Sequence, residues 1–270
     1  DVHAVNGVSL QVKRGDALCV VGESGCGKST VARLIAGLLT PSAGEIHYEG
    51  ARIDDKSRRE LMPMRKKMQM IFQNPYASLN PRMTVGVDPT WMGRYPHEFS
   101  GGQRQRIAIA RALTVDPEFI IADEPISALD VSIQAQVLNL MLEAKEERGL
   151  TYLFITHDLS VVQHFGTQVA VLYLGVVCEL SDTATLFENP KHPYTKALLS
   201  AVPQLSDDSP SHIRLKGEIP TPINLPQGCP FQSRCVSVNS RCMTDVPRPL
   251  MQPDGALVAC HAVEEGRLTS

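Results

Sequence analysis

The sequence lacks an excess of positive charge, a long apolar run and a secretion signal. Its formal net charge is −3, with 26 Lys and Arg against 29 Asp and Glu, so no general basic field is available to hold nucleic acid. The longest uninterrupted run of apolar residues and glycine, at 169–178, is about half as long as a membrane span. The first residues show no basic segment followed by an apolar one, so no signal peptide is visible.

The absence of a visible secretion signal bears on the state of the cysteines, because the cytosol is reducing and the secretory route is oxidising. The chain opens on Asp1 rather than on methionine and in the middle of a pattern, so we expect further residues upstream. Without a visible secretory signal, a cytosolic location with free thiols is the simplest interpretation of the 7 cysteines. This weakens a disulfide interpretation.

Short apolar runs alternate with helical patterns over the first two-thirds of the chain. The runs typical of buried strands are 17–21, 68–72, 119–122, 152–155 and 169–172, and the alternation at 8–12 predicts one more. The helical patterns are 29–38, 102–113, 131–148 and 158–165. This order predicts an α/β fold with a mainly parallel central sheet.

The composition changes after about residue 203. Proline, glycine and cysteine become frequent, and the periodic apolar pattern fades. We place a boundary there, between a first domain at 1–203 and a small, irregular, cysteine-containing C-terminal extension at 204–270. A segment with so little regular structure needs cross-links or a metal to fold.

The segment GESGCGKST fits the phosphate-loop pattern G-x-x-x-x-G-K-S/T between a buried strand and a helix. Its glycines let successive backbone N–H groups turn toward a phosphate, and the helix N-terminus adds its positive dipole end. Lys28 is predicted to contact the β- and γ-phosphates, and the Ser29 hydroxyl to bind Mg²⁺. The predicted nucleotide contacts are Gly22, Glu23, Ser24, Gly25, Cys26, Gly27, Lys28, Ser29 and Thr30.

Two carboxylates end the apolar run FIIADEP at 119–125. Asp123 is placed to hold Mg²⁺ through water, and Glu124 to polarise a water for attack on the γ-phosphate. Alone, such a pair is weak evidence, because acidic residues are common in solvated loops. After a phosphate loop the pair predicts nucleotide hydrolysis.

A third element decides the class. FSGGQRQRIAIARAL at 99–113 puts Ser100, Gly101, Gly102 and Gln103 at the start of a helix. Gln73 follows an apolar strand, SALD ends at Asp130, and His157 follows YLFIT. Together these motifs resemble the nucleotide-binding subunit of an ATP-binding-cassette (ABC) transporter.

The resemblance implies the ABC type of P-loop NTPase fold and an ATPase coupled to transmembrane transport. In that family two homologous subunits enclose two ATP molecules, and each phosphate loop faces the Ser-Gly-Gly segment of the second subunit. By resemblance, Gln73 contacts the Mg²⁺ and the attacking water, His157 contacts the γ-phosphate, and Asp130 lies at the dimer interface. Arg104, Arg106 and Arg111 are interpreted as charges on the helix surface.

The sequence departs from the family pattern between Gln73 and Ser100. The family inserts a helical subdomain here, but only residues 74–99 are present, and four prolines interrupt them. We expect that residues are missing between Gly86 and Asp88, or that the subdomain is shortened. The aromatic residue that stacks on adenine has no clear counterpart, and His3 is a weak substitute.

Two later stretches are more diagnostic of the subfamily. ENPKHPYTKALLSAVP and LKGEIPTPINLPQGCPF resemble the C-terminal extension of oligopeptide and dipeptide importer ATPases. The resemblance implies a second ATPase subunit, two transmembrane permease subunits and an external substrate-binding protein, with this chain peripheral on the cytoplasmic face of a bacterial inner membrane. Nickel and glutathione importers share the extension, so the cargo stays open.

Four cysteines mark that extension: Cys229, Cys235, Cys242 and Cys260. Four thiolates on one metal centre would stabilise the segment by coupling binding to folding. The C-x₂₋₄-C spacing typical of zinc is absent, whereas iron–sulfur clusters tolerate varied spacing. The resemblance favours a 4Fe–4S cluster, with Zn²⁺, a disulfide or unligated thiols as alternatives. His261 is interpreted as a neighbour of Cys260 rather than a ligand.

Two rival functions stay open. One is a cassette ATPase without a membrane partner, acting in translation or DNA repair, against which the net charge counts. The other is a regulatory subunit that senses redox state through the cluster. A small-molecule kinase would leave FSGGQ without a role.

Overall fold

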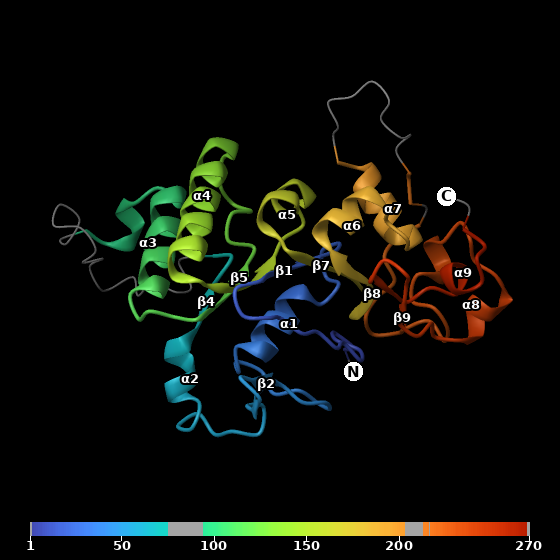
Figure 1. Ribbon diagram of the computed structural model, residues 1–270, viewed down its shortest axis with the longest axis horizontal. Coiled ribbons are helices and arrows are strands. Elements are labelled where there is room, and N and C mark those ends of the chain that lie inside the picture. Colours follow the sequence, from blue (N-terminus) through green and yellow to red (C-terminus); the bar gives the residue numbers. More distant parts are fainter. Residues whose placement is uncertain (1, 75–93, 203–212, 216, 269–270) are drawn as a thin grey trace. The chain divides into compact units, whose positions relative to one another are not determined.

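The computed structural model describes residues 2–74, 94–202, 213–215 and 217–268 (Figure 1). The chain forms two compact units. The first contains Asp1–Gln11, Leu18–Thr30 and His157–Ser270, and the second contains Val12–Ala17 and Val31–Thr156.

The first unit is built on the strand order β1-β7-β8-β10-β9. Strand β1 (Ala17–Val21) is buried at all five positions and pairs in parallel with β7 (Gln168–Tyr173). Strand β8 (Val176–Asp182) pairs antiparallel with both β7 and β10 (Leu257–Val258), and β9 (Leu250–Met251) completes the order. Complete burial of β1 explains why its sequence is continuously apolar rather than alternating.

The sheet is mixed: the pairings of β1 with β7, of Met68–Ile71 with Phe119–Asp123 and of Phe119–Asp123 with Thr151–Ile155 are parallel as predicted, and the antiparallel pairings involve β8, β9 and β10, which were not predicted. Strands β7 and β8 are joined by only two residues, Leu174 and Gly175, with φ of 45° and 76°. Two successive left-handed residues make the tight turn that fits the twist of a hairpin, and a two-residue connection can join only antiparallel strands. The sequence analysis missed this turn because apolar residues continue on both sides of it.

Helices of the first unit follow and flank these strands. The strand-to-helix transition at β1 leads into α1 (Lys28–Ile35), whose first residues belong to this unit. The others are α5 (Leu159–Phe165), α6 (Thr183–Glu188), α7 (Pro193–Ser200), α8 (Ser240–Thr244) and α9 (His261–Glu264), with a 3₁₀ turn η3 at Gln232–Arg234.

The second unit contains a parallel strand set in the order β4-β5-β6. These strands are β4 (Met68–Ile71), β5 (Phe119–Asp123) and β6 (Thr151–Ile155). Helices α3 (Gly101–Leu113) and α4 (Val131–Arg148) run side by side (Figure 1). The unit also holds α2 (Met62–Lys67), the 3₁₀ turn η2 (Pro96–Glu98) and the hairpin of β2 (His47–Tyr48) with β3 (Ala51–Arg52).

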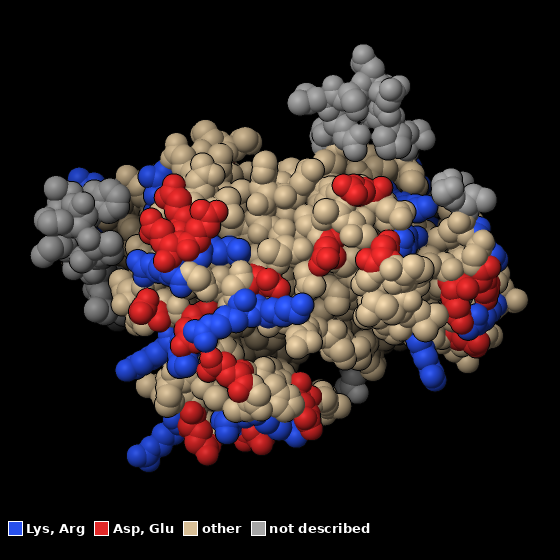
Figure 2. Space-filling view, viewed as in Figure 1, with Lys and Arg blue, Asp and Glu red and all other residues tan. Residues whose placement is uncertain are grey.

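Most of the predicted strands and helices are confirmed, with ends within a few residues. The alternating stretch 8–12 is an exception, because it forms no strand. Alternation alone does not supply a hydrogen-bonding neighbour. No helix in the described part of the chain combines the length and apolar character needed to cross a bilayer. Figure 2 shows acidic and basic side chains interspersed on the face that it draws.

Gly228 lets two segments of the C-terminal region approach closely. A Cβ at this position would lie 2.3 Å from the carbonyl oxygen of Cys242 and 2.6 Å from the carbonyl carbon of Met243. The adjacent amide of Cys229 donates to the same Cys242 oxygen over 2.8 Å, so the backbone cannot move away without losing that hydrogen bond.

We predict that Gly228→Ala lowers the free energy of unfolding by about 1–3 kcal/mol, the usual cost of overpacking. Thermal unfolding followed by circular dichroism measures the change. Gly101→Ala is the matched control, because the nearest atom to its Cβ would be Leu129 Cδ2 at an ordinary 3.8 Å. Equal unfolding temperatures for the Gly228→Ala chain and the unmodified chain would contradict the prediction.

Candidate functional site

The phosphate loop lies in the first unit between β1 and α1. Lys28 is only 5% exposed, and its Nζ donates to the carbonyl oxygens of Gly22 at 2.7 Å and Glu23 at 3.0 Å. The Gly175 amide donates to the Cys26 carbonyl at 2.9 Å. The loop is therefore folded around its own lysine, with Ser29 and Thr30 in the first turn of α1.

Two further contacts hold this loop, and both come from residues that the sequence analysis does not single out. The Glu23 amide donates to Tyr194 Oη at 2.9 Å. Arg234 forms an ion pair with the Glu23 carboxylate, with Nη1 2.5 Å from Oε2. No local pattern could have revealed these contacts, because they join positions more than 170 residues apart.

The carboxylate pair ends strand β5 in the second unit. Asp123 is 3% exposed, and Glu124 follows with φ of 47°, a left-handed conformation that is uncommon for a residue with a side chain. The Glu124 amide donates to the Ile155 carbonyl at 3.0 Å. This fixes the turn that presents the Glu124 side chain beyond the strand.

Gln73 and Glu124 come together, although 51 positions separate them. Gln73 Nε2 donates to Glu124 Oε2 at 3.0 Å and to Ser127 Oγ at 3.5 Å. Because β4 and β5 are parallel neighbours, the residues that follow them meet at one sheet edge. The amide orients the carboxylate and adds no charge to it.

Ser100, Gly101, Gly102 and Gln103 form the capped start of α3. Ser100 Oγ accepts a hydrogen bond from the Gln103 amide at 3.3 Å, and Gln103 Oε1 accepts one from the Ser100 amide at 3.0 Å. This reciprocal capping box fixes the first turn. A 13-residue helix then directs its positive dipole end and the first-turn amides toward any anion placed there.

The remaining predicted residues lie at element ends. His157, at the start of the first unit's last segment, is exposed, and so is Asp130 at the N-terminus of α4. His3 is also exposed, and its amide donates to the Pro222 carbonyl at 2.8 Å. The stretch in which the family's helical subdomain is expected to be shortened, with the expected break between Gly86 and Asp88, falls in 75–93 and lies outside the described residues.

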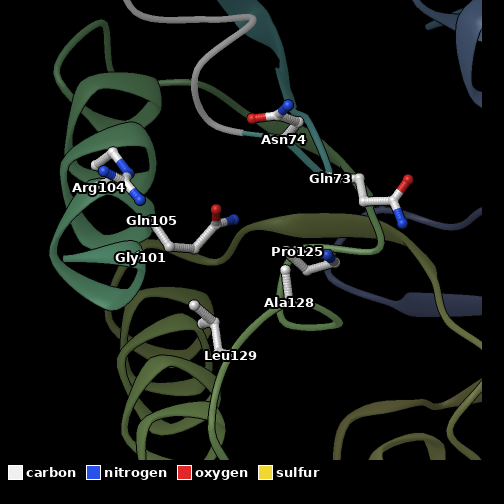
Figure 3. A pocket seen from close by; sticks show the side chains of 8 residues that line it. All are labelled: Gln73, Asn74, Gly101, Arg104, Gln105, Pro125, Ala128 and Leu129. Atoms are coloured by element: carbon white, nitrogen blue, oxygen red, sulfur yellow. The ribbon is translucent and has the colours of Figure 1, made fainter. Parts of the chain in front are cut away.

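A pocket of about 480 Å³ opens beside Gln73 in the second unit (Figure 3). Gln105 reaches into it from α3, and its Nε2 is buried without a hydrogen-bond partner among the described residues. Arg104 also lines the pocket and donates to the Phe99 carbonyl at 2.6 Å. The half-buried Arg104 side chain thus folds back onto the entry to the helix.

The four cysteines of the C-terminal region lie near one another. Burial raises the pKa of the Cys229 thiol to about 12, with further upward contributions from the thiols of Cys242, Cys260 and Cys235. Burial likewise raises the pKa of Cys235 and Cys260, and the Arg267 guanidinium opposes the rise at both. Burial therefore disfavours the thiolate form of Cys229, Cys235 and Cys260.

These thiols are not arranged as a ready-made ion site. All seven cysteines of the chain are free, so the disulfide alternative is wrong. Among the described residues, no group of three or more His, Cys, Asp or Glu side chains is placed to hold a metal ion. His261 is occupied elsewhere, since Nε2 lies 3.0 Å from the Asp245 carbonyl oxygen and Nδ1 3.4 Å from Glu264 Oε2.

Two family models match the sequence. The model described as "ABC transporter" matches residues 5–88 and 86–127, in two pieces that meet where the sequence predicts missing residues. The model described as "Oligopeptide/dipeptide transporter, C-terminal region" matches residues 178–242.

Relatives match nearly the whole chain. The oligopeptide transport ATP-binding protein AppF of Bacillus subtilis is 49% identical over 295 residues, covering 97% of this chain and 90% of that protein. The dipeptide transport ATP-binding protein DppF of Haemophilus influenzae is 47% identical over 294 residues, covering 97% and 90%. Both alignments are longer than the 270-residue chain, so these relatives contain residues that it lacks.

Solved structures agree with the fold. The ATP-binding cassette MJ0796, in a dimeric post-hydrolysis state bound to ADP and Pi, is 29% identical with a TM-score of 0.62 and covers 67% of this chain and 91% of that one. CbiO1 of Clostridium perfringens, part of the ABC transporter complex cbiONQ, is 28% identical with a TM-score of 0.62, and covers 69% and 84%.

Proposed function

Because the chain belongs to the family of ABC transporter ATP-binding proteins that carry the oligopeptide/dipeptide transporter C-terminal region, we propose that it hydrolyses ATP to power the uptake of oligopeptides or dipeptides through a membrane permease. The observation that supports this most directly is the presence of both family regions on one chain, with peptide-transport relatives matching over nearly its full length.

The proposed hydrolysis uses the residues described above in distinct roles. Lys28 neutralises the β- and γ-phosphates, and the loop amides and the α1 N-terminus add donors. Ser29 would hold Mg²⁺ through its hydroxyl and Asp123 would hold it through a water, and the ion would supply charge neutralisation when bound. Glu124 accepts the proton of the attacking water, and Gln73 holds its carboxylate in place.

A second ATPase subunit completes the proposed site. Its Ser100 to Gln103 segment, with the capped α3 N-terminus behind it, closes on the γ-phosphate. His157 contacts the same phosphate, and Asp130 lies at the interface. ATP then stabilises the closed dimer, and hydrolysis removes the phosphate that holds the two halves together.

We place the complex at the cytoplasmic face of a bacterial inner membrane, with this chain peripheral to two permease subunits and an external substrate-binding protein supplying cargo. Residues 1–203 act as the cassette and residues 204–270 as the irregular, cysteine-containing extension.

Cargo is tested by reconstituting the subunits in liposomes and measuring ATP-dependent uptake of radiolabelled dipeptide, oligopeptide, Ni²⁺ and glutathione. Uptake of Ni²⁺ or glutathione alone would replace the peptide assignment, and ATPase activity that no permease stimulates would favour the membrane-independent rival.

We further propose that Cys229, Cys235, Cys242 and Cys260 hold a metal centre, a 4Fe–4S cluster in the first place and Zn²⁺ as the alternative. The feature that supports it is proximity: beside burial, the thiols of Cys242, Cys260 and Cys235 all contribute to the raised pKa of Cys229, so the four cysteines belong to one neighbourhood.

We predict about four irons and four acid-labile sulfides per chain after purification without oxygen, with both lost in Cys235→Ser. Metal analysis and a visible spectrum measure this, and Cys19→Ser, in the buried strand β1, is the matched control. One zinc without iron would select the alternative, and absence of both metals would reject the centre. Equal ATPase rates in the oxidised and reduced states would reject redox sensing.

A further inference from the structure

The C-terminal region contacts the phosphate loop through the buried side chain of an arginine. Arg234 ends the 3₁₀ turn η3, and its side chain is only 7% exposed. Nη1 lies 2.5 Å from Glu23 Oε2, and Nη2 lies 3.1 Å from Glu23 Oε1. This two-pronged pairing fixes the orientation of the carboxylate and neutralises its charge.

Packing holds Arg234 in that position. The guanidinium carbon lies 5.9 Å from the centroid of the Tyr173 ring, within the range of a cation–π contact. Phe231, three residues earlier, packs against Tyr173 and Tyr194 with centroid separations of 5.2 and 5.4 Å. These rings are almost completely buried, so the turn that carries the arginine is anchored on the same core as the loop.

Glu23 is thus held at two points by residues far along the chain. Tyr194 Oη accepts a hydrogen bond from its amide, and Arg234 holds its carboxylate. The Glu23 carbonyl in turn accepts from Lys28 Nζ at 3.0 Å. A change at Arg234 is therefore expected to affect Lys28 through Glu23, which contacts both side chains.

The charge of the pair matters as well as its geometry. Glu23 puts a carboxylate, 26% exposed, inside a loop that is built to receive polyphosphate. Without a partner, that charge would oppose the nucleotide, because like charges at short range repel strongly where water is partly excluded. Arg234 neutralises it where it arises.

We propose that Arg234 is a positioning residue for the phosphate loop, acting through Glu23, so that nucleotide affinity depends on the C-terminal region. The inference rests on the proposed function, in which this loop binds the phosphates of ATP. The segment that would position the phosphate loop thus belongs to the same chain and lies next to Cys235.

A double-mutant cycle with Mg·ADP as the probe tests the proposal. By isothermal titration calorimetry, Arg234→Gln is expected to weaken binding about 10-fold, because it leaves an unpaired carboxylate in the loop. Glu23→Gln keeps an oxygen that Arg234 can bond, so the change should stay within about 3-fold. The double variant should bind like Glu23→Gln, since a neutral side chain no longer needs the arginine.

A second measurement does not depend on nucleotide. Hydrogen exchange of the amides at 22–28, without ligand, should be faster in Arg234→Gln than in the unmodified chain. Arg234→Lys keeps the charge but loses the two-pronged geometry of the guanidinium, so its exchange rates should lie between those of Arg234→Gln and of the unmodified chain. This variant replaces Arg234→Gln in the test if Arg234→Gln does not fold. Arg241→Gln is the matched control, because it removes ion pairs with Glu264 and Glu265 in the same region and should change neither readout.

Unchanged Mg·ADP affinity and unchanged exchange in Arg234→Gln would overturn the proposal. So would a double variant about 30-fold weaker than the unmodified chain, since independent effects would mean that Arg234 does not act through Glu23. Failure of the unmodified chain to bind Mg·ADP would instead count against the proposed function, and the exchange measurement would still decide the role of Arg234.

Discussion

Glu124→Gln is expected to lower ATP turnover by about 100- to 1,000-fold while leaving nucleotide binding close to that of the unmodified chain. A positioned general base contributes a factor of this size, and the substitution removes the basic oxygen with almost no change in volume. The backbone should not be disturbed, because the turn imposes the φ of 47° at this position and glutamine adopts that φ as readily as glutamate does.

The neighbouring contacts support this expectation. Gln73 Nε2 donates to Glu124 Oε2 at 3.0 Å, and a glutamine at 124 still offers an oxygen to accept that hydrogen bond. The Glu124 amide keeps its hydrogen bond to the Ile155 carbonyl. The variant therefore separates loss of the base from loss of structure.

Steady-state phosphate release and light scattering measure the two consequences. With ATP and Mg²⁺ the variant should accumulate as a dimer, since the bound nucleotide is no longer consumed. Glu146→Gln, an exposed position on α4, is the matched control and should behave like the unmodified chain. Turnover near the unmodified level in Glu124→Gln would remove this residue from the proposed mechanism.

Local patterns predicted the strands and helices around the cassette motifs, because these depend on neighbours in the sequence. The phosphate loop needs a buried strand, glycines and a helix within a few residues, and all lie in 17–35. Ser100 and Gln103, three positions apart, cap the helix that they begin. The apolar run at 119–122 predicted a strand followed by the two carboxylates, and β5 ends at Asp123.

The remaining features depend on contacts that the sequence does not display. The hairpin at Leu174 and Gly175 is hidden in an apolar run, since only the positive φ values mark it as a turn. Arg234 is one arginine in an irregular segment until the fold brings it to Glu23. The partnership of Gln73 with Glu124 follows from the parallel register of β4 and β5, which no local pattern encodes.

Lys28→Ala is expected to abolish measurable ATP turnover and to weaken binding of Mg·ATP by about 100-fold. A charge-assisted contact to phosphate in a partly buried site is worth a few kcal/mol, and each 1.4 kcal/mol changes affinity tenfold. Fluorescence titration with a labelled ATP measures binding, and phosphate release measures turnover. Lys13→Ala, at an exposed position, is the control and should leave both unchanged.

The loop itself gives this prediction a second, independent readout. Lys28 Nζ donates to the carbonyl oxygens of Gly22 and Glu23, so the ammonium also holds the loop together. Alanine leaves those oxygens without that donor, and the loop amides should exchange faster with solvent. Loss of turnover with unchanged exchange would mean that the lysine acts on the phosphates alone. Retained turnover would show that the phosphates are neutralised by another group, and the assignment of this loop as the ATP site would fail.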